Sequence, residues 1–78
     1  MRVKLDPDGP EPLSQQLAAL LRSEIETGKR RPGSRLPSIN ELAEQYGIAT
    51  GTARKALNIL KDAGLATGSV GHGTFVAR

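Results

Sequence analysis

The sequence predicts an α+β fold, mainly α, in which three helices are followed by a C-terminal two-stranded β hairpin. Apolar residues recur at helical spacing in three segments between residues 13 and 63, and after Gly64 the period changes to short β runs around Gly71-His72-Gly73. The 78 residues suit one small domain, and none of them is cysteine. We therefore expect packing, and no disulfide, to hold the fold together.

Residues 1–12 are expected to form an extended N-terminal arm, because Pro7, Pro10 and Pro12 cannot continue a helix. The domain proper is expected at residues 13–78, and its first helix at about 13–27. The apolar positions of this helix recur at steps of three and four: Leu13, Leu17, Leu20, Leu21 and Ile25. Gly28 is placed to end it as a left-handed cap.

The second helix, expected at about residues 38–46, has the clearest start signal. Ser38 and Glu41 have the S-x-x-E spacing of a capping box, in which each residue satisfies the backbone N–H of the other. The apolar series that follows lies at i, i+3, i+4 and i+7: Ile39, Leu42, Ala43 and Tyr46. Gly47 is expected to end this helix.

The third helix is expected at about residues 50–63, with Thr50 as a candidate for its N-cap. Its apolar face repeats the same spacing at Ala53, Ala56, Leu57 and Leu60. The hairpin is expected at residues 65–77. Tyr46, Phe75 and Val76 are expected in the core, as large apolar residues usually are.

The second and third helices are separated by about three residues, so they must meet at a steep angle. This is the spacing of a helix-turn-helix, whose second helix can enter a DNA major groove about 12 Å wide. Gly47 permits the turn, Ala43 allows the helices to approach, and Ile48 fills the junction. Because purely structural three-helix domains have the same spacing, it leaves the function open.

The charges are distributed unevenly along the chain. Residues 1–28 carry three cations and five acids (net −2), whereas residues 29–78 carry eight cations and three acids (net +5). This asymmetry is typical of a fold with one face toward a polyanion, although a solvated basic face is the alternative. Proteins that bind single strands or RNA loops stack bases on aromatic side chains, and this chain has only Tyr46 and Phe75. Duplex DNA is therefore the favoured polyanion.

Along residues 13–77 the sequence resembles the N-terminal domain of the GntR family. The matching pieces are Leu36-Pro37-Ser38, Glu41-Leu42-Ala43, Gly47-Ile48, Thr52-Ala53-Arg54, Ala56-Leu57, Gly64-Leu65 and Gly71-His72-Gly73-Thr74-Phe75-Val76. The first and last pieces at this separation make the resemblance specific. It implies a winged helix-turn-helix that binds operator DNA as a dimer, with the third helix in the major groove and the tip of the hairpin, the wing, in the adjacent minor groove.

The chain also departs from the family pattern. The family usually has Glu-Arg where this chain has Ile39-Asn40, and Ser-Arg where it has Ala49-Thr50. The wing of the family often carries basic residues before its glycine, whereas residues 67–70 here are neutral. Fewer cations release fewer counterions from DNA, so we expect weaker and less salt-dependent binding than in a typical member.

The candidate DNA-binding residues lie on the second and third helices, on the loop before them and at the wing tip: Arg35, Ser38, Asn40, Thr50, Gly51, Thr52, Arg54, Lys55, Gly71, His72 and Gly73. Arg54 matches a family position that contacts DNA, and its guanidinium can bond a guanine edge or a phosphate, unless it is simply a solvated helix arginine. Lys55 and Arg35 are phosphate candidates.

The polar candidates have structural alternatives. Thr50 and Thr52 can bond DNA or cap the helix, and Asn40 can pair with adenine or remain an exposed first-turn residue. At the wing tip, glycines allow close backbone approach, and a neutral His72 imidazole can donate one N–H to DNA. If His72 contacts DNA, binding should strengthen slightly as the pH falls. With a single histidine and no cysteine, we expect no metal and no cofactor.

These features predict a sequence-specific, duplex DNA-binding transcriptional regulator, expected to be a repressor that acts on a palindromic operator as a homodimer. One alternative is a winged-helix adaptor that binds protein and not DNA, which would need no cations at Arg54 and Lys55. The other is an enzyme, but no nucleophile with a base, carboxylate pair or metal cluster is evident. The presence of Arg54 and Lys55 favours DNA binding over the adaptor.

The location and the wider architecture are expectations from composition. No apolar stretch resembles a signal peptide or a membrane span, so we expect a cytoplasmic, nucleoid-associated protein with no membrane contact. No effector-binding domain is visible in the 78 residues. We therefore expect either an excised domain or a naturally short family member.

Overall fold

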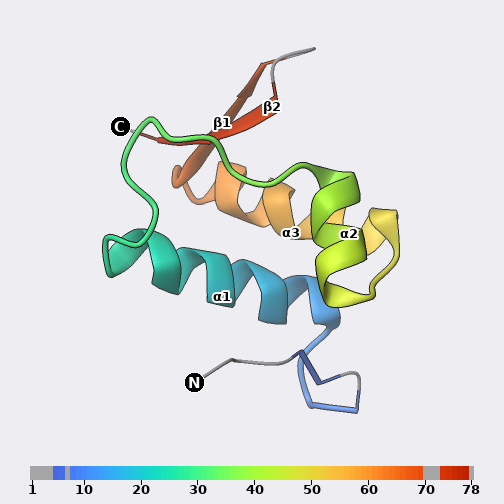
Figure 1. Cartoon of the computed structure of the whole chain (residues 1–78). Helices are drawn as coiled ribbons and strands as arrows, with labels where there is room; N and C mark the ends of the chain where they lie inside the picture. The colour runs from blue at the N-terminus through green and yellow to red at the C-terminus, as the bar shows by residue number, and fades with distance from the viewer. Residues whose placement is uncertain (1–4, 7, 70–72, 78) are drawn as a thin grey trace.

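A computed structural model describes residues 5–6, 8–69 and 73–77 of the chain. In these residues the elements follow the order α1 (Leu13–Glu26), α2 (Ile39–Tyr46), α3 (Thr50–Asp62), β1 (Ala66–Ser69) and β2 (Gly73–Val76). Figure 1 shows α1 and α3 running side by side, with α2 at one end of the pair and the hairpin extending beyond α3. This is the predicted fold class.

The core lies between α1 and α3 and includes residues from every element. Its fully buried large side chains are Leu17, Leu21, Leu36, Leu42, Leu60 and Val76. Two alanines and two leucines that repeat at helical spacing place the inner face of α3 in this core, because Ala53, Ala56, Leu57 and Leu60 are all buried. Small residues at this face let the other elements pack closely around α3.

The helix ends differ by one residue from the expected bounds, because the residues concerned are caps. Thr27 is the C-cap of α1, Ser38 the N-cap of α2 and Ala63 the C-cap of α3. A glycine in the left-handed region follows each of the three helices: Gly47, with φ 65°, comes directly after α2, whereas Gly28 (φ 84°) and Gly64 (φ 76°) come after the caps of α1 and α3. Such backbone angles favour glycine and stop the helix.

Thr50 does not cap α3, contrary to the sequence-based expectation. The N-cap is Ala49, which has an extended backbone and no side chain able to bond the first turn, and Thr50 is the first helical residue. The Ala49 carbonyl accepts the Thr52 and Ala53 N–H groups at 3.1 Å each, which fixes the first turn one residue earlier than expected. The side chain of Thr50 is exposed.

The hairpin register places Phe75 outside the core, so the expectation that Phe75 is a core residue was wrong. Ala66 pairs with Val76 and Gly68 with Thr74, and Ala66, Thr74 and Val76 are buried on one face. Since side chains alternate along a strand, Phe75 lies on the other face, where it is half-buried. Tyr46 packs at the edge of the core, and burial, with Glu24 nearby, raises the pKa of its phenol.

The segment expected to be an extended arm turns back toward α1 in its described part. The Asp6 N–H donates to Gln16 Oε1 at 2.7 Å, and Gln16 Nε2 donates to the carbonyls of Asp6 and Glu11 at 2.7 Å each. Leu5 packs against the core. The prolines prevent a helix here, as expected, but the Gln16 amide provides partners that favour a folded segment over an extended one.

Candidate nucleic-acid interface

The start of α2 is fixed by the predicted capping box. Ser38 Oγ accepts the Glu41 N–H at 3.1 Å, and Glu41 Oε1 accepts the Ser38 N–H at 3.0 Å. The hydrogen bonds with the backbone and the hydroxyl of Ser38, supported by the nearby charge of Arg35, lower the pKa of the Glu41 carboxyl. These reciprocal bonds satisfy backbone N–H groups that the start of α2 would otherwise leave without partners.

The turn from α2 to α3 is built by Gly47 and Ile48. The left-handed backbone of Gly47 lets both its own N–H and that of Ile48 bond the Ala43 carbonyl. Ile48 packs against the core, and Ala49 is the N-cap that precedes α3. The two helices therefore meet at a three-residue turn, which is the geometry of a helix-turn-helix.

The outer surface of α3 carries the basic residues singled out in the sequence. Arg54 and Lys55 are exposed, opposite the buried face of the helix. Within the described residues, neither side chain forms an ion pair. Thr52 differs from expectation because it is half-buried, which restricts its hydroxyl to the margin of this surface.

The N-terminal turn of α3 is open. Gly51 is exposed, and a Cβ built on it would meet nothing within 4 Å, so the protein fold itself does not require glycine at this position. Among the described residues, no acceptor is found for the Thr50 and Gly51 N–H groups. The first N–H groups of a helix form a ready anion site with its dipole.

Arg35 is positioned by the loop before α2, which pairs with the second hairpin strand. The Leu36 N–H donates to the Thr74 carbonyl at 2.8 Å, and Arg35 forms an isolated β bridge with Phe75. The exposed Arg35 side chain crosses Gly73, where a built Cβ would lie 3.2 Å from Arg35 Nε. Two predicted site residues, Arg35 and Gly73, are thus brought together at the hairpin.

The structure places one further cation on this side, which the sequence interpretation missed. Lys61, in the last turn of α3, lies over Gly68 of β1: a Cβ built on Gly68 would stand 2.7 Å from Lys61 Nζ. The only sequence signal was a glycine inside a strand, which often marks the close approach of another group. That signal does not identify which group approaches.

The remaining candidates are placed only in part. Asn40 is exposed on the first turn of α2. Gly71 and His72 lie outside the described residues. The predicted contacts of the wing tip, including the histidine, therefore stay predictions.

The ion pairs of the described residues involve α1 and the loop after it, and not the cations of this surface. On α1, Arg22 pairs with Glu26 at 3.6 Å, and Glu24 pairs with Arg30 of the following loop at 2.8 Å. These are the ion pairs found among the described residues, and they do not include the cations around α3 and the hairpin: Arg35, Arg54, Lys55 and Lys61. Lys29 and Arg31, in the loop after α1, are also absent from these ion pairs, so the unpaired positive charge of the described residues lies on this loop and around α3 and the hairpin.

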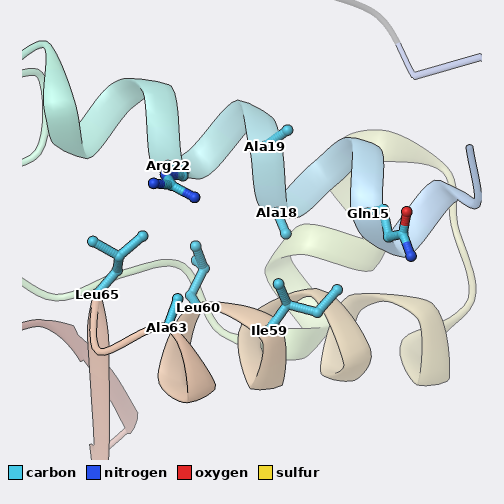
Figure 2. A pocket seen from close by; sticks show the side chains of 8 residues that line it. All are labelled: Gln15, Ala18, Ala19, Arg22, Ile59, Leu60, Ala63 and Leu65. Carbon is cyan, nitrogen blue, oxygen red and sulfur yellow. The ribbon is translucent and has the colours of Figure 1, made fainter.

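A shallow hollow of about 180 Å³ lies between α1 and α3. Figure 2 shows Ala18 and Arg22 projecting from α1 toward α3, with Ile59 and Leu60 facing them. Its lining is mostly apolar, and within the described part of the chain no three histidine, cysteine, aspartate or glutamate side chains gather as metal ligands. No described helix combines the length and apolar character needed to cross a bilayer.

Comparison with known proteins identifies the family. Residues 13–76 match the family described as bacterial regulatory proteins, gntR family. The HTH-type transcriptional repressor NagR of Bacillus subtilis is 37% identical over 76 residues, which cover 97% of this chain and 31% of NagR. The chain thus spans less than a third of the length of this relative.

Solved structures agree with this assignment. YtrA from Sulfolobus acidocaldarius, a GntR-family transcription factor, superposes with a TM-score of 0.90 at 33% identity, covering 97% of this chain and 80% of YtrA. AraR(DBD) in complex with operator ORX1 gives a TM-score of 0.84 at 35% identity, covering 97% of this chain and all of that one. The winged helix-turn-helix predicted from the sequence is confirmed, and the chain belongs to the gntR family of bacterial regulatory proteins.

Proposed function

We propose that this chain is the sequence-specific DNA-binding part of a transcriptional repressor, with α3 as its recognition helix. The proposal rests on the difference between the two faces of α3. Its inner residues are buried in the core, while Arg54 and Lys55 are exposed without ion-pair partners in the described residues. A cationic, outward-facing helix at a helix-turn-helix suits the major groove of duplex DNA.

The proposed roles follow from chemistry and position. Arg54 reads a guanine edge or bonds a phosphate, and Lys55 and Arg35 bond phosphates. The N-terminal turn of α3, with Thr50, Gly51 and the margin residue Thr52, meets the DNA backbone through N–H and hydroxyl groups. Ser38 and Asn40 at the start of α2 are proposed to contact the same backbone. Gly71, His72 and Gly73 are proposed to reach the minor groove.

Two known proteins support this proposal. The solved structure of AraR(DBD) holds a domain of the same fold on its operator, and NagR is named a repressor. By extension we propose that the whole protein acts in the cytoplasm, at the nucleoid, as a homodimer on a palindromic operator. The half-sites would then lie about one helical turn, or 10 base pairs, apart.

Selection of bound fragments from a random-sequence duplex pool tests the proposal. Sequencing of the retained fragments should reveal an enriched motif, and fluorescence anisotropy should give tighter binding to that duplex than to a random one. The affinity should also fall as salt rises, because bound phosphates release counterions. Recovery of no enriched sequence would refute sequence-specific binding and favour a winged-helix adaptor that binds protein.

A further inference from the structure

The two described strands of the wing carry no charged side chain. They read Ala-Thr-Gly-Ser in β1 and Gly-Thr-Phe-Val in β2. A neutral hairpin has little attraction for a phosphate backbone, since sequence-independent DNA affinity comes mostly from lysine and arginine. Any positive charge along these strands must therefore come from a neighbouring element.

Lys61 brings such a charge from the last turn of α3. A Cβ built on Gly68 would lie 2.7 Å from Lys61 Nζ and 2.8 Å from its Cε, so the end of the lysine occupies the space that a side chain at position 68 would need. Both residues are exposed, which leaves the ammonium group within reach of solvent and of a ligand. The absence of a side chain at Gly68 thus leaves room for the end of the lysine.

The register shows that the hairpin is flanked by cations on both faces. Gly68 pairs with Thr74, so both residues lie on the same face of the hairpin. The buried residues Ala66 and Val76 also lie on this face. Gly73 pairs with Ser69 and so belongs to the opposite face, where the Arg35 guanidinium crosses it. Lys61 and Arg35 therefore approach the hairpin from its two sides, each over a glycine.

A purely structural role explains less of this arrangement. A lysine in the last turn of a helix interacts favourably with the helix dipole, and Lys61 stands in that turn. The dipole, however, gives no reason for the side chain to lie across a strand. In the described residues Lys61 also has no ion-pair partner, although Asp62 is its neighbour in sequence.

We propose that Lys61 is a phosphate-binding residue of the wing. Resting on Gly68, its ammonium group donates to a DNA phosphate beside the hairpin and supplies the charge that the strands lack. This inference rests on the proposed DNA-binding function and adds a residue to it. As a point charge on a phosphate, Lys61 should strengthen binding to all duplex sequences alike.

The test compares Lys61→Ala with Arg22→Ala, which removes one positive charge from α1. Fluorescence anisotropy would follow binding to the selected duplex and to a random duplex across 50 to 200 mM NaCl. Lys61→Ala should reduce the slope of log affinity against log salt by about 0.9, so that the loss of affinity over this range becomes about threefold smaller. Arg22→Ala should leave the slope unchanged.

A rescue variant tests whether the lost charge, and not a change in the fold, causes the reduced slope. In the double variant Lys61→Ala/Gly68→Lys, the ammonium is carried by β1 itself, and the slope should return to that of the wild type. Equal slopes for wild type and Lys61→Ala, or a reduced slope that the double variant fails to restore, would overturn the proposal. If the wild type binds no duplex at all, the DNA-binding function fails instead, which distinguishes the two results.

Discussion

Ser38 and Glu41 satisfy each other's backbone N–H groups at the start of α2, with donor–acceptor distances of 3.0 and 3.1 Å. This reciprocal pair fixes where the helix-turn-helix begins and where the loop that carries Arg35 ends. It also places a carboxylate with a lowered pKa beside the proposed DNA surface. The pair therefore links the stability of the fold to pH.

The first prediction concerns this pH dependence. Since the pKa of Glu41 lies below its ordinary value of 4.5, its ionised form stabilises the folded state above that pH. The contribution is lost as the pH falls through the lowered pKa. Urea unfolding of wild type and Glu41→Gln should therefore differ most near neutral pH and converge in acid.

Glu44→Gln is the matched control, because Glu44 is an exposed carboxylate on the same helix outside the capping box. It should not reproduce the acid convergence. The same pH profile for both glutamine variants would show that the cap does not cause the effect.

The second prediction follows from the uncapped start of α3. Ala49 has the extended backbone of an N-cap, with φ −68° and ψ 150°, but no side chain that can accept an N–H from the first turn. Ala49→Ser should stabilise the fold by about 0.5–2 kcal/mol, measured by chemical denaturation. Ala49→Val, which offers no oxygen, serves as the control. No gain for serine over valine would contradict the proposed cap geometry.

The third prediction compares two glycines of the helix-turn-helix. Gly47 has φ 65°, a region in which a side chain costs roughly 1–2 kcal/mol, so Gly47→Ala should destabilise the fold by about that amount. Gly51 lies inside α3 with open space around it, so Gly51→Ala should stabilise the fold by up to about 1 kcal/mol. Thermal unfolding of both variants would test the pair, and shifts of the same sign would contradict it.

The fourth prediction distinguishes base contact from phosphate contact on α3. Arg54→Ala should weaken binding to the selected duplex by about 1–3 kcal/mol and relax its sequence preference. Lys55→Ala should weaken binding to selected and random duplexes alike and lower the salt slope by about 0.9. Because both side chains are exposed, neither change should alter stability by more than about 0.5 kcal/mol. Unaltered operator affinity would remove Arg54 from the interface.

Local sequence signals predicted the helices because the physics that forms them is local. Apolar periodicity identified the buried face of α3, and the four residues from Ser38 to Glu41 contain the whole capping box. The same periodicity placed Arg54 and Lys55 on the outer surface. These features depend on neighbours within one or two helical turns, which can be read directly from a sequence.

Features that depend on distant partners were missed. The face of Phe75 is set by pairing with β1 and with the loop at Arg35, and a four-residue strand gives too short an alternation to reveal it. The folded arm depends on Gln16, ten residues from Asp6. Likewise, the contact between Lys61 and Gly68 forms only once α3 and β1 have packed together.

The fifth prediction tests whether the hollow between α1 and α3 belongs to the core. Leu60 is 1% exposed and its neighbour Ile59 is 38% exposed, although both line the hollow. Leu60→Ala should cost about 2–5 kcal/mol because it leaves a cavity among close-packed side chains. Ile59→Ala should cost less than about 1 kcal/mol, because solvent already reaches the side chain and water can fill the space it vacates. Urea denaturation of the two variants measures this difference, and comparable losses would mean that Ile59 is buried in solution by a contact outside the described fold.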